Sequence, residues 1–138
     1  MEKYYTKRYE SFKRCLSDLT DAKTRDYKND SFVKSGVTSK FSLTFDLSWK
    51  VMKDIIGEYY NITDYATGSP SENLKMAFKV GLIDDDSTWK EMLHLRNELA
   101  HDYNGILADE ACEHIVHTYI DFLLKFEESI DAFILGET

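Results

Sequence analysis

The stretch TSKFSLTFDLSWKVMKDIIGEYY, which spans residues 38–60, decides the fold class of this chain. Between Phe41 and Trp49, apolar and polar residues alternate as they do in a half-buried β-strand. The same apolar residues also recur four positions apart, and the pattern continues through Met52 and Ile56, well past the usual length of a strand. We therefore predict a central helix that is apolar on two sides, with two rows of side chains: Phe41, Phe45 and Trp49 in one, and Leu43, Leu47, Val51 and Ile55 in the other.

The part of the chain before this helix divides into a helix and a connector. From about Lys3 to Asp21, apolar residues recur at steps of three and four, which predicts an amphipathic helix whose apolar face is formed by Tyr5, Tyr9, Phe12, Leu16 and Leu19. Residues 21–37 lose this pattern, and Gly36 is interpreted as a break before the central helix. We expect a connector there, with or without a partly helical stretch.

Capping signals delimit a short third helix. Ser69 is suited to cap its first turn, Pro70 fits the first helical position, and Glu72 completes a capping box. Gly81 supplies the left-handed residue that ends a helix, and Leu82 is placed to fold back as in a Schellman motif.

Two more helices follow. The acidic run Asp84–Asp86 precedes a fourth helix, in which Thr88 and Glu91 form another possible capping box, and the run is interpreted as capping rather than as a metal site. The pair Asn104-Gly105 interrupts the chain. A long final helix is then marked by apolar residues at helical spacing, namely Leu107, Ala111, Ile115, Tyr119, Phe122, Phe126, Ile130 and Phe133.

Length and composition agree with a helical domain. The 138 residues fit a single domain, residues 1–138, and one proline with six glycines leaves little material for a turn-rich all-β fold. Five helices, of which the third is short, imply antiparallel neighbours with short connections. The predicted fold class is all-α, an antiparallel up-and-down four-helix bundle with a short additional helix.

Charge and cysteine content narrow the function classes. A net charge of −8 argues against general binding to a phosphate backbone, and the net charge of +4 over residues 1–40 is interpreted as a solvated helix face. Cys15 and Cys112 have no close pairing partner in the sequence, and no signal peptide or long apolar run is present. These features favour a cytoplasmic protein with no membrane role.

The stretch LRNELAHDY, residues 95–103, places an arginine inside an apolar stripe. At 100° per residue, Arg96 lies near the centre of the sector that holds Trp89, Met92, Leu93, Leu99 and Ala100. A guanidinium in a dry core is strongly unfavourable unless it is paired, so Arg96 needs a partner, a cleft or an interface. On a continuing helix Asn97 and His101 lie on the same flank, whereas Tyr103 joins them only if the helix ends before Asn104.

At these residues the sequence resembles the HEPN proteins, and within them the bacterial nucleotidyltransferase substrate-binding proteins. Arg96, Asn97 and His101 match the family motif of Arg, a polar residue and a later His, and Tyr103 matches the extended form Arg-x4-His-x-Tyr. Residues 36–54 and 72–103 also resemble the second helix and the third and fourth helices of the family, in the expected order.

The resemblance implies a homodimer in which Arg96 and His101 line a polar groove at or near the dimer interface, together with a small nucleotidyltransferase as partner. It implies metal-independent RNA cleavage without a cofactor, as in toxins of toxin–antitoxin pairs, with His101 as general acid or base, Arg96 stabilising the phosphate and Asn97 binding phosphate or orienting the imidazole. Tyr103 would be the hydroxyl that the partner adenylylates (AMPylation) to block this endoribonuclease.

Two other interpretations stay open. The bundle could be a non-catalytic accessory subunit that helps the nucleotidyltransferase to hold its substrate, or an unrelated helical interaction protein. No metal site is predicted, because His114 and His117 have only Cys112 and Glu113 nearby and no second ligand cluster. Surface or packing roles are favoured for His114 and His117. His94 could reach the groove, but an exposed role suits it at least as well. Both cysteines are expected to be buried or partly buried thiols.

Overall fold

A computed structural model describes residues 6–59, 68–101, 105 and 107–136. Every regular element in these ranges is helical, which confirms the predicted all-α class. The elements are α1 (Thr6–Thr20), a 3₁₀ turn (Asp21–Thr24), α2 (Ser31–Tyr59), α3 (Pro70–Lys79), α4 (Asp86–Leu99), α5 (Ala108–His114), a π-helical turn (Ile115–Tyr119) and α6 (Ile120–Gly136).

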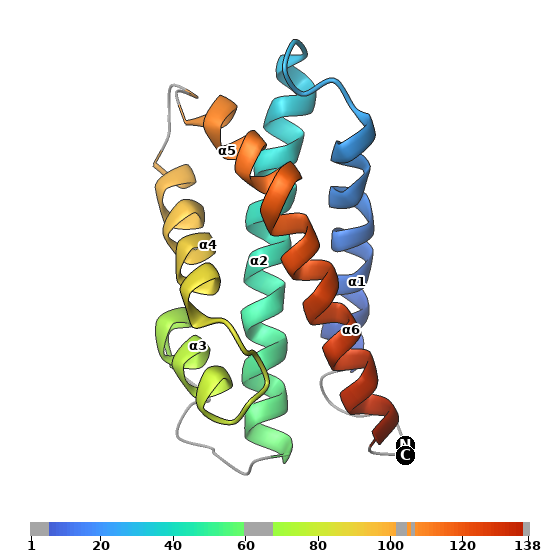
Figure 1. Ribbon diagram of the computed structural model, residues 1–138, viewed down its shortest axis with the longest axis vertical. Coiled ribbons are helices and arrows are strands. Elements are labelled where there is room, and N and C mark those ends of the chain that lie inside the picture. Colours follow the sequence, from blue (N-terminus) through green and yellow to red (C-terminus); the bar gives the residue numbers. More distant parts are fainter. Residues whose placement is uncertain (1–5, 60–67, 102–104, 106, 137–138) are drawn as a thin grey trace.

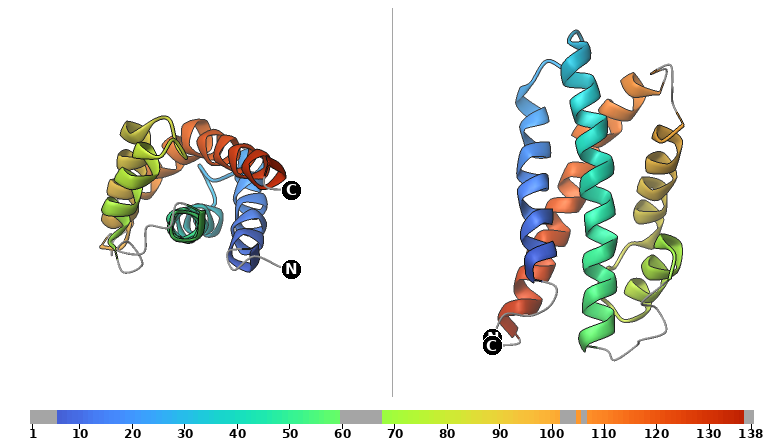
Figure 2. Two further views of the ribbon diagram at one scale, coloured as in Figure 1. Left: turned by 90° about the horizontal axis from the view of Figure 1, so that it is seen from below. Right: turned by 180° about the vertical axis from the view of Figure 1, so that it is seen from behind.

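The long helices alternate in direction along the chain, and α2 lies between the others (Figure 1). Seen from below, α1 flanks α2 on one side, α3 and α4 flank it on the opposite side, and α6 crosses a third side (Figure 2). The view from behind shows the outer face of α2 uncovered by another helix (Figure 2). None of the helices in the described ranges combines the length and apolarity that a membrane span requires.

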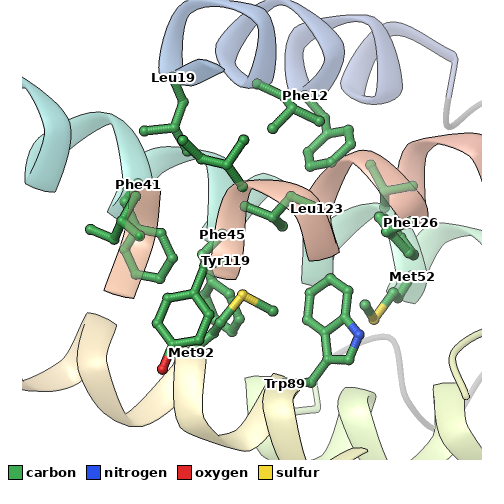
Figure 3. Packing of buried hydrophobic residues seen from close by; sticks show 14 of the residues in the cluster. Phe12, Leu19, Phe41, Phe45, Met52, Trp89, Met92, Tyr119, Leu123 and Phe126 are labelled. Carbon is green, nitrogen blue, oxygen red and sulfur yellow. The ribbon is translucent and has the colours of Figure 1, made fainter. Parts of the chain in front are cut away.

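Aromatic rings join the four long helices in one core (Figure 3). Phe45 of α2 lies 6.1 Å from Trp89 of α4, and Trp89 makes an edge contact with Phe126 of α6 at 5.1 Å between ring centroids. Phe126 in turn meets the edge of Phe12 of α1 at 5.7 Å. Contacts of this geometry add to the hydrophobic stabilisation from burial, so these rings stabilise the packing of α1, α2, α4 and α6 against one another.

The central helix is confirmed, with a buried stripe that differs from the two predicted rows. Phe41 and Phe45 are fully buried, but Leu43 is 52% exposed. Thr44 and Ser48 are buried instead, because their hydroxyls donate hydrogen bonds of 2.6 Å to the carbonyl oxygens of Lys40 and Phe45. A hydroxyl satisfied by its own helix can be buried at little cost, which a hydropathy pattern does not reveal.

The predicted break at Gly36 is wrong, because α2 begins at Ser31 and runs through this glycine. The side chain of Asp30 accepts hydrogen bonds from the backbone N–H groups of Phe32 at 2.9 Å and Val33 at 3.2 Å. A capped first turn offsets the roughly 1 kcal/mol that a glycine costs inside a helix. The connector after α1 is therefore short and includes the 3₁₀ turn.

The third helix has the predicted ends. Ser69 accepts a hydrogen bond of 3.2 Å from the backbone N–H of Glu72, and Pro70 opens the helix. Gly81 has φ +83°, and Leu82 donates its N–H to the carbonyl of Ala77 at 2.8 Å, as a Schellman motif requires.

The fourth and final helices differ in detail from the prediction. Asp85, rather than Thr88, is the N-cap of α4, and its carboxylate accepts the N–H and the hydroxyl of Thr88, both at 3.0 Å. The pKa of Asp85 is lowered mainly by the backbone hydrogen bond from Thr88. The final helix runs from Ala108 to Gly136 but contains the π-helical turn at Ile115–Tyr119.

Candidate functional site

Arg96 lies in the last turn of α4, on the side that faces α2. Its Nε and Nη2 atoms donate to Oδ1 and Oδ2 of Asp46, each at 2.9 Å, in a bidentate ion pair. Hydrogen bonding to Asp46 raises the pKa of Arg96, and burial opposes this shift. The arginine in the apolar stripe is thus paired with a carboxylate of its own chain, whereas the resemblance implied phosphate or acidic groups of a partner.

Asp46 is the site residue that the sequence analysis missed. It is the one acidic side chain between Thr38 and Lys53, a stretch whose other charged residues are lysines. A charge on the central helix of a bundle needs a partner for the same reason that Arg96 does. Asp46 was therefore a candidate partner for Arg96, although the sequence alone does not show how the two helices meet.

A hydroxyl-lined groove opens beside Arg96, with a volume of about 410 Å³. Its walls come from the first half of α2, the end of α4 and the start of α5, and the lining residues are Ser35, Thr38, Ser39, Ser42, Arg96, Leu99, Ala100, Gly105 and Ala108. Hydroxyls and a guanidinium both donate hydrogen bonds to phosphate oxygens. The groove therefore has the chemistry of a site for a phosphate-bearing ligand.

Asn97 and His101 are exposed, and neither lines the groove. The side-chain oxygen of Asn97 accepts a hydrogen bond of 3.4 Å from Nη1 of Arg96. α4 ends at Leu99, so His101 lies in a turn after the helix, where its backbone N–H donates to the carbonyl of Glu98 at 3.0 Å. The structure thus brings Arg96 and Asn97 together, whereas no hydrogen bond within the described ranges links the exposed His101 imidazole to either of them.

The helix end settles one condition that the sequence left open. Because α4 stops at Leu99, the continuing helix that would pair Asn97 with His101 one turn apart is not present. The helix does end before Asn104, which is the condition under which Tyr103 could turn toward the motif. Tyr103 itself lies outside the described residues.

The other titratable candidates lie apart from this groove. His94, His114 and His117 are exposed and each contacts a glutamate one turn away on its own helix, namely Glu98, Glu110 and Glu113. Within the ranges that the structure describes, no three potential ligands gather to hold a metal ion. Cys15 is half-buried and Cys112 is buried, as predicted, and burial raises the pKa of the Cys112 thiol to about 11.

Comparison with known proteins places the chain in a family. No curated protein sequence matches it. Residues 7–132, which extend from α1 into the last turns of α6 and include both Asp46 and Arg96, match the family described as nucleotidyltransferase substrate binding protein like. This match agrees with the resemblance seen in the sequence, and the chain belongs to the nucleotidyltransferase substrate-binding-protein-like family.

Proposed function

We propose that this chain is the partner of a small nucleotidyltransferase and that it cleaves RNA without a metal ion at the groove beside Arg96. The observation that carries the proposal is the position of the guanidinium, which faces a groove lined by four hydroxyl side chains while His101 is exposed just past the end of the same helix. The family supports the association with a nucleotidyltransferase.

The reaction needs three roles, which the residues at the groove can fill. The ribose 2′-oxygen attacks the adjacent phosphorus, the bond to the 5′-oxygen breaks, and a cyclic phosphate and a free 5′-hydroxyl result. His101 takes the proton of the 2′-hydroxyl or supplies the one that the leaving oxygen needs, since imidazole titrates near neutral pH. Arg96 binds the phosphate oxygens as negative charge develops, and Asn97 steadies the guanidinium through its hydrogen bond. The requirement for the 2′-hydroxyl selects RNA over DNA.

A homodimer is part of this proposal. The outer face of α2 is uncovered by another helix (Figure 2). Leu43 of the same helix is 52% exposed. Ser39 and Ser42 flank Leu43 and also line the groove, so a second copy on this face would border both grooves. Two copies would bring two His101 imidazoles to one RNA strand, one as base and one as acid.

Regulation by adenylylation of Tyr103 completes the proposal. Tyr103 follows His101 by two residues, so an adenylate on its hydroxyl would put a bulky anion close to the motif. An anionic group beside the groove would compete with RNA for Arg96. The partner nucleotidyltransferase would supply the adenylate from ATP, with pyrophosphate as the leaving group.

A non-catalytic accessory role is the second candidate, and a specific observation favours it. Asp46 already neutralises Arg96, and the chain carries a net charge of −8, so the groove attracts polyanions only weakly. In that role the groove would hold the phosphate-bearing substrate of the nucleotidyltransferase rather than cleave RNA.

Expression with and without the partner distinguishes the two candidates. We expect the wild-type chain alone to slow growth and to degrade RNA, and His101→Ala to do neither. Identical behaviour of wild type and His101→Ala in the absence of the partner would leave only the accessory role. Intact mass after incubation with the partner and ATP tests the modification, because a mass gain of adenylate units should be absent in Tyr103→Phe.

A further inference from the structure

Asp46 holds Arg96 in a geometry that leaves some N–H groups of the guanidinium without an acceptor among the described residues. We propose that Asp46 is a positioning residue, whose carboxylate orients the end of the Arg96 fork toward a phosphate group in the hydroxyl-lined groove. This inference rests on the proposed function, which places an RNA phosphate at Arg96. It assigns a role on α2 to a residue that lies 50 positions from the arginine in the sequence.

The donors of Arg96 can be counted. A guanidinium has five N–H groups in a fixed plane. Asp46 accepts two of them, through Nε and Nη2, and Asn97 accepts one from Nη1. Among the described residues, one N–H on each terminal nitrogen has no acceptor, and because the guanidinium is planar the one on Nη2 points away from the side-chain stem, where it can donate to a phosphate oxygen.

The lining of the groove shows on which side of the guanidinium its partners lie. Arg96 lines the groove, whereas neither Asp46 nor Asn97 belongs to its lining. The Asp46 carboxylate therefore binds the guanidinium from outside the groove and does not occupy the space proposed for the phosphate. Ser42 lies one turn before Asp46 on α2, so the helix that fixes the carboxylate also presents the hydroxyls.

The opposite role is a latch, in which phosphate must displace Asp46 before it can bind. Both roles use the same ion pair, but they predict opposite effects when the carboxylate is removed. A latch or simple electrostatics predicts tighter RNA binding for Asp46→Asn, because the substitution removes one negative charge. A positioning residue predicts weaker binding and slower cleavage in spite of that gain in charge.

The test uses the purified full chain with a short single-stranded RNA. Binding is measured by fluorescence anisotropy in the His101→Ala background, which separates affinity from cleavage, and cleavage is measured with His101 present. For Asp46→Asn we expect binding weakened about fivefold, the equivalent of one lost hydrogen bond, and cleavage slowed on the order of 100-fold through misplacement of the guanidinium.

Asp18→Asn is the matched control. Asp18 pairs with Lys40 at 3.5 Å, is exposed, and lies outside the groove, so the substitution changes the charge equally without touching Arg96. We expect its RNA binding to be unchanged or slightly tighter. Asp46→Glu keeps the carboxylate, and we expect it to restore binding to within about twofold of wild type while cleavage stays slower, since both donors can still be met at a shifted position.

Three results would overturn the inference. Binding by Asp46→Asn that equals or exceeds wild type supports the latch, and loss of helical circular dichroism in both Asp46 variants assigns the residue a purely structural role. Failure of the His101→Ala chain to bind RNA removes this inference together with the proposed function. If that chain binds RNA but the wild type does not cleave it, only the nuclease function fails, and the binding measurements still decide the role of Asp46.

Discussion

Asp46 and Asp54 both lie on α2, about two turns apart, and each pairs with an arginine of a neighbouring helix. Asp46 is 25% exposed, and both of its oxygens are bonded by the fork of Arg96. Asp54 is only 6% exposed, and Arg8 of α1 reaches only its Oδ1, at 2.9 Å. Its Oδ2 is buried and has no hydrogen-bond partner among the residues that the structure describes.

The difference indicates that the Arg8–Asp54 pair stabilises the packing of two helices, whereas the Arg96–Asp46 pair lies beside a groove. The Asp54 carboxylate has lost its water and is incompletely paired, so burial raises its pKa against the opposing effect of Arg8. The Asp46 pair has better geometry and stays in contact with solvent, so its loss leaves charges that water can still reach. We therefore expect stability to depend on the first pair and activity on the second.

Removing Arg8 should have the largest effect on stability. Arg8→Ala leaves a nearly buried carboxylate without its cation, and we expect the free energy of unfolding to fall by about 2 kcal/mol, below the full cost of a broken buried pair because Arg8 is itself one-third exposed. Urea unfolding at neutral pH measures the change. Lys13→Ala, which breaks an exposed pair with Asp131, is the control and should change stability little. Equal losses in the two variants would contradict the assigned difference.

The pH dependence of stability should follow Asp54. Its pKa is raised in the folded state, mainly by burial, so the folded state favours the protonated carboxyl. The contribution of this group is fully present below its unfolded pKa of about 4 and is lost as the pH rises through the higher folded value. Asp54→Asn cannot ionise, so its stability relative to wild type should increase between pH 4 and pH 7.

Urea unfolding of both proteins at several pH values tests this direction. Asp46→Asn, measured in parallel, reports the same chemical change at the solvated carboxylate. A relative stability of Asp54→Asn that is constant with pH, or that falls as the pH rises, would count against the burial of Asp54 as the cause.

Removing Arg96 should affect stability less than removing Arg8. The pair with Asp46 is partly solvated on both sides, so we expect Arg96→Ala to lower the free energy of unfolding by about 0.5 to 1 kcal/mol. Under the proposed function the same variant loses RNA cleavage, whereas Arg8→Ala keeps it at a temperature where the variant is folded. Urea unfolding measures the stability of the two variants, and an RNA cleavage assay measures their activity. A larger loss of stability in Arg96→Ala, or a larger loss of cleavage in Arg8→Ala, would contradict the roles assigned to the two pairs.

The sequence predicted the helices and the motif better than it predicted which groups pair across the bundle. Helix signals are local: the helical spacing of apolar residues and the caps at Ser69 and Gly81 each involve residues that lie close together in the sequence. Such signals can be recognised from a single sequence. Arg96 was identified as a charge that needs a partner. The identity of that partner depends on how two helices meet, and their spacing along the chain carries no such information.

The errors also have physical causes. Gly36 was interpreted as a helix break, although Asp30 before it carries a capping signal that outweighs one glycine. Thr44 and Ser48 were left out of the core because they are polar, although their hydroxyls are satisfied within the helix and both are buried. Leu43 was placed in the core although it is 52% exposed. Each error comes from assigning a residue type one fixed preference for burial or for helix breaking. In these cases a hydrogen bond or an uncovered helix face determines the outcome instead.

The smallest expected effect tests the half of α2 that carries the groove. A Cβ added at Gly36 would meet no atom within 4 Å, so Gly36→Ala should fit the helix and raise the free energy of unfolding by about 0.5 to 1 kcal/mol. Gly81→Ala is the contrasting control, because its φ of +83° is strained for alanine and should lower stability by about 1 kcal/mol. Gly36 does not line the groove, so RNA binding should be unchanged. A destabilising Gly36→Ala would mean that the helix does not extend from Ser31, and the Ser35 and Ser39 hydroxyls would then lose the regular support that aligns them with Arg96.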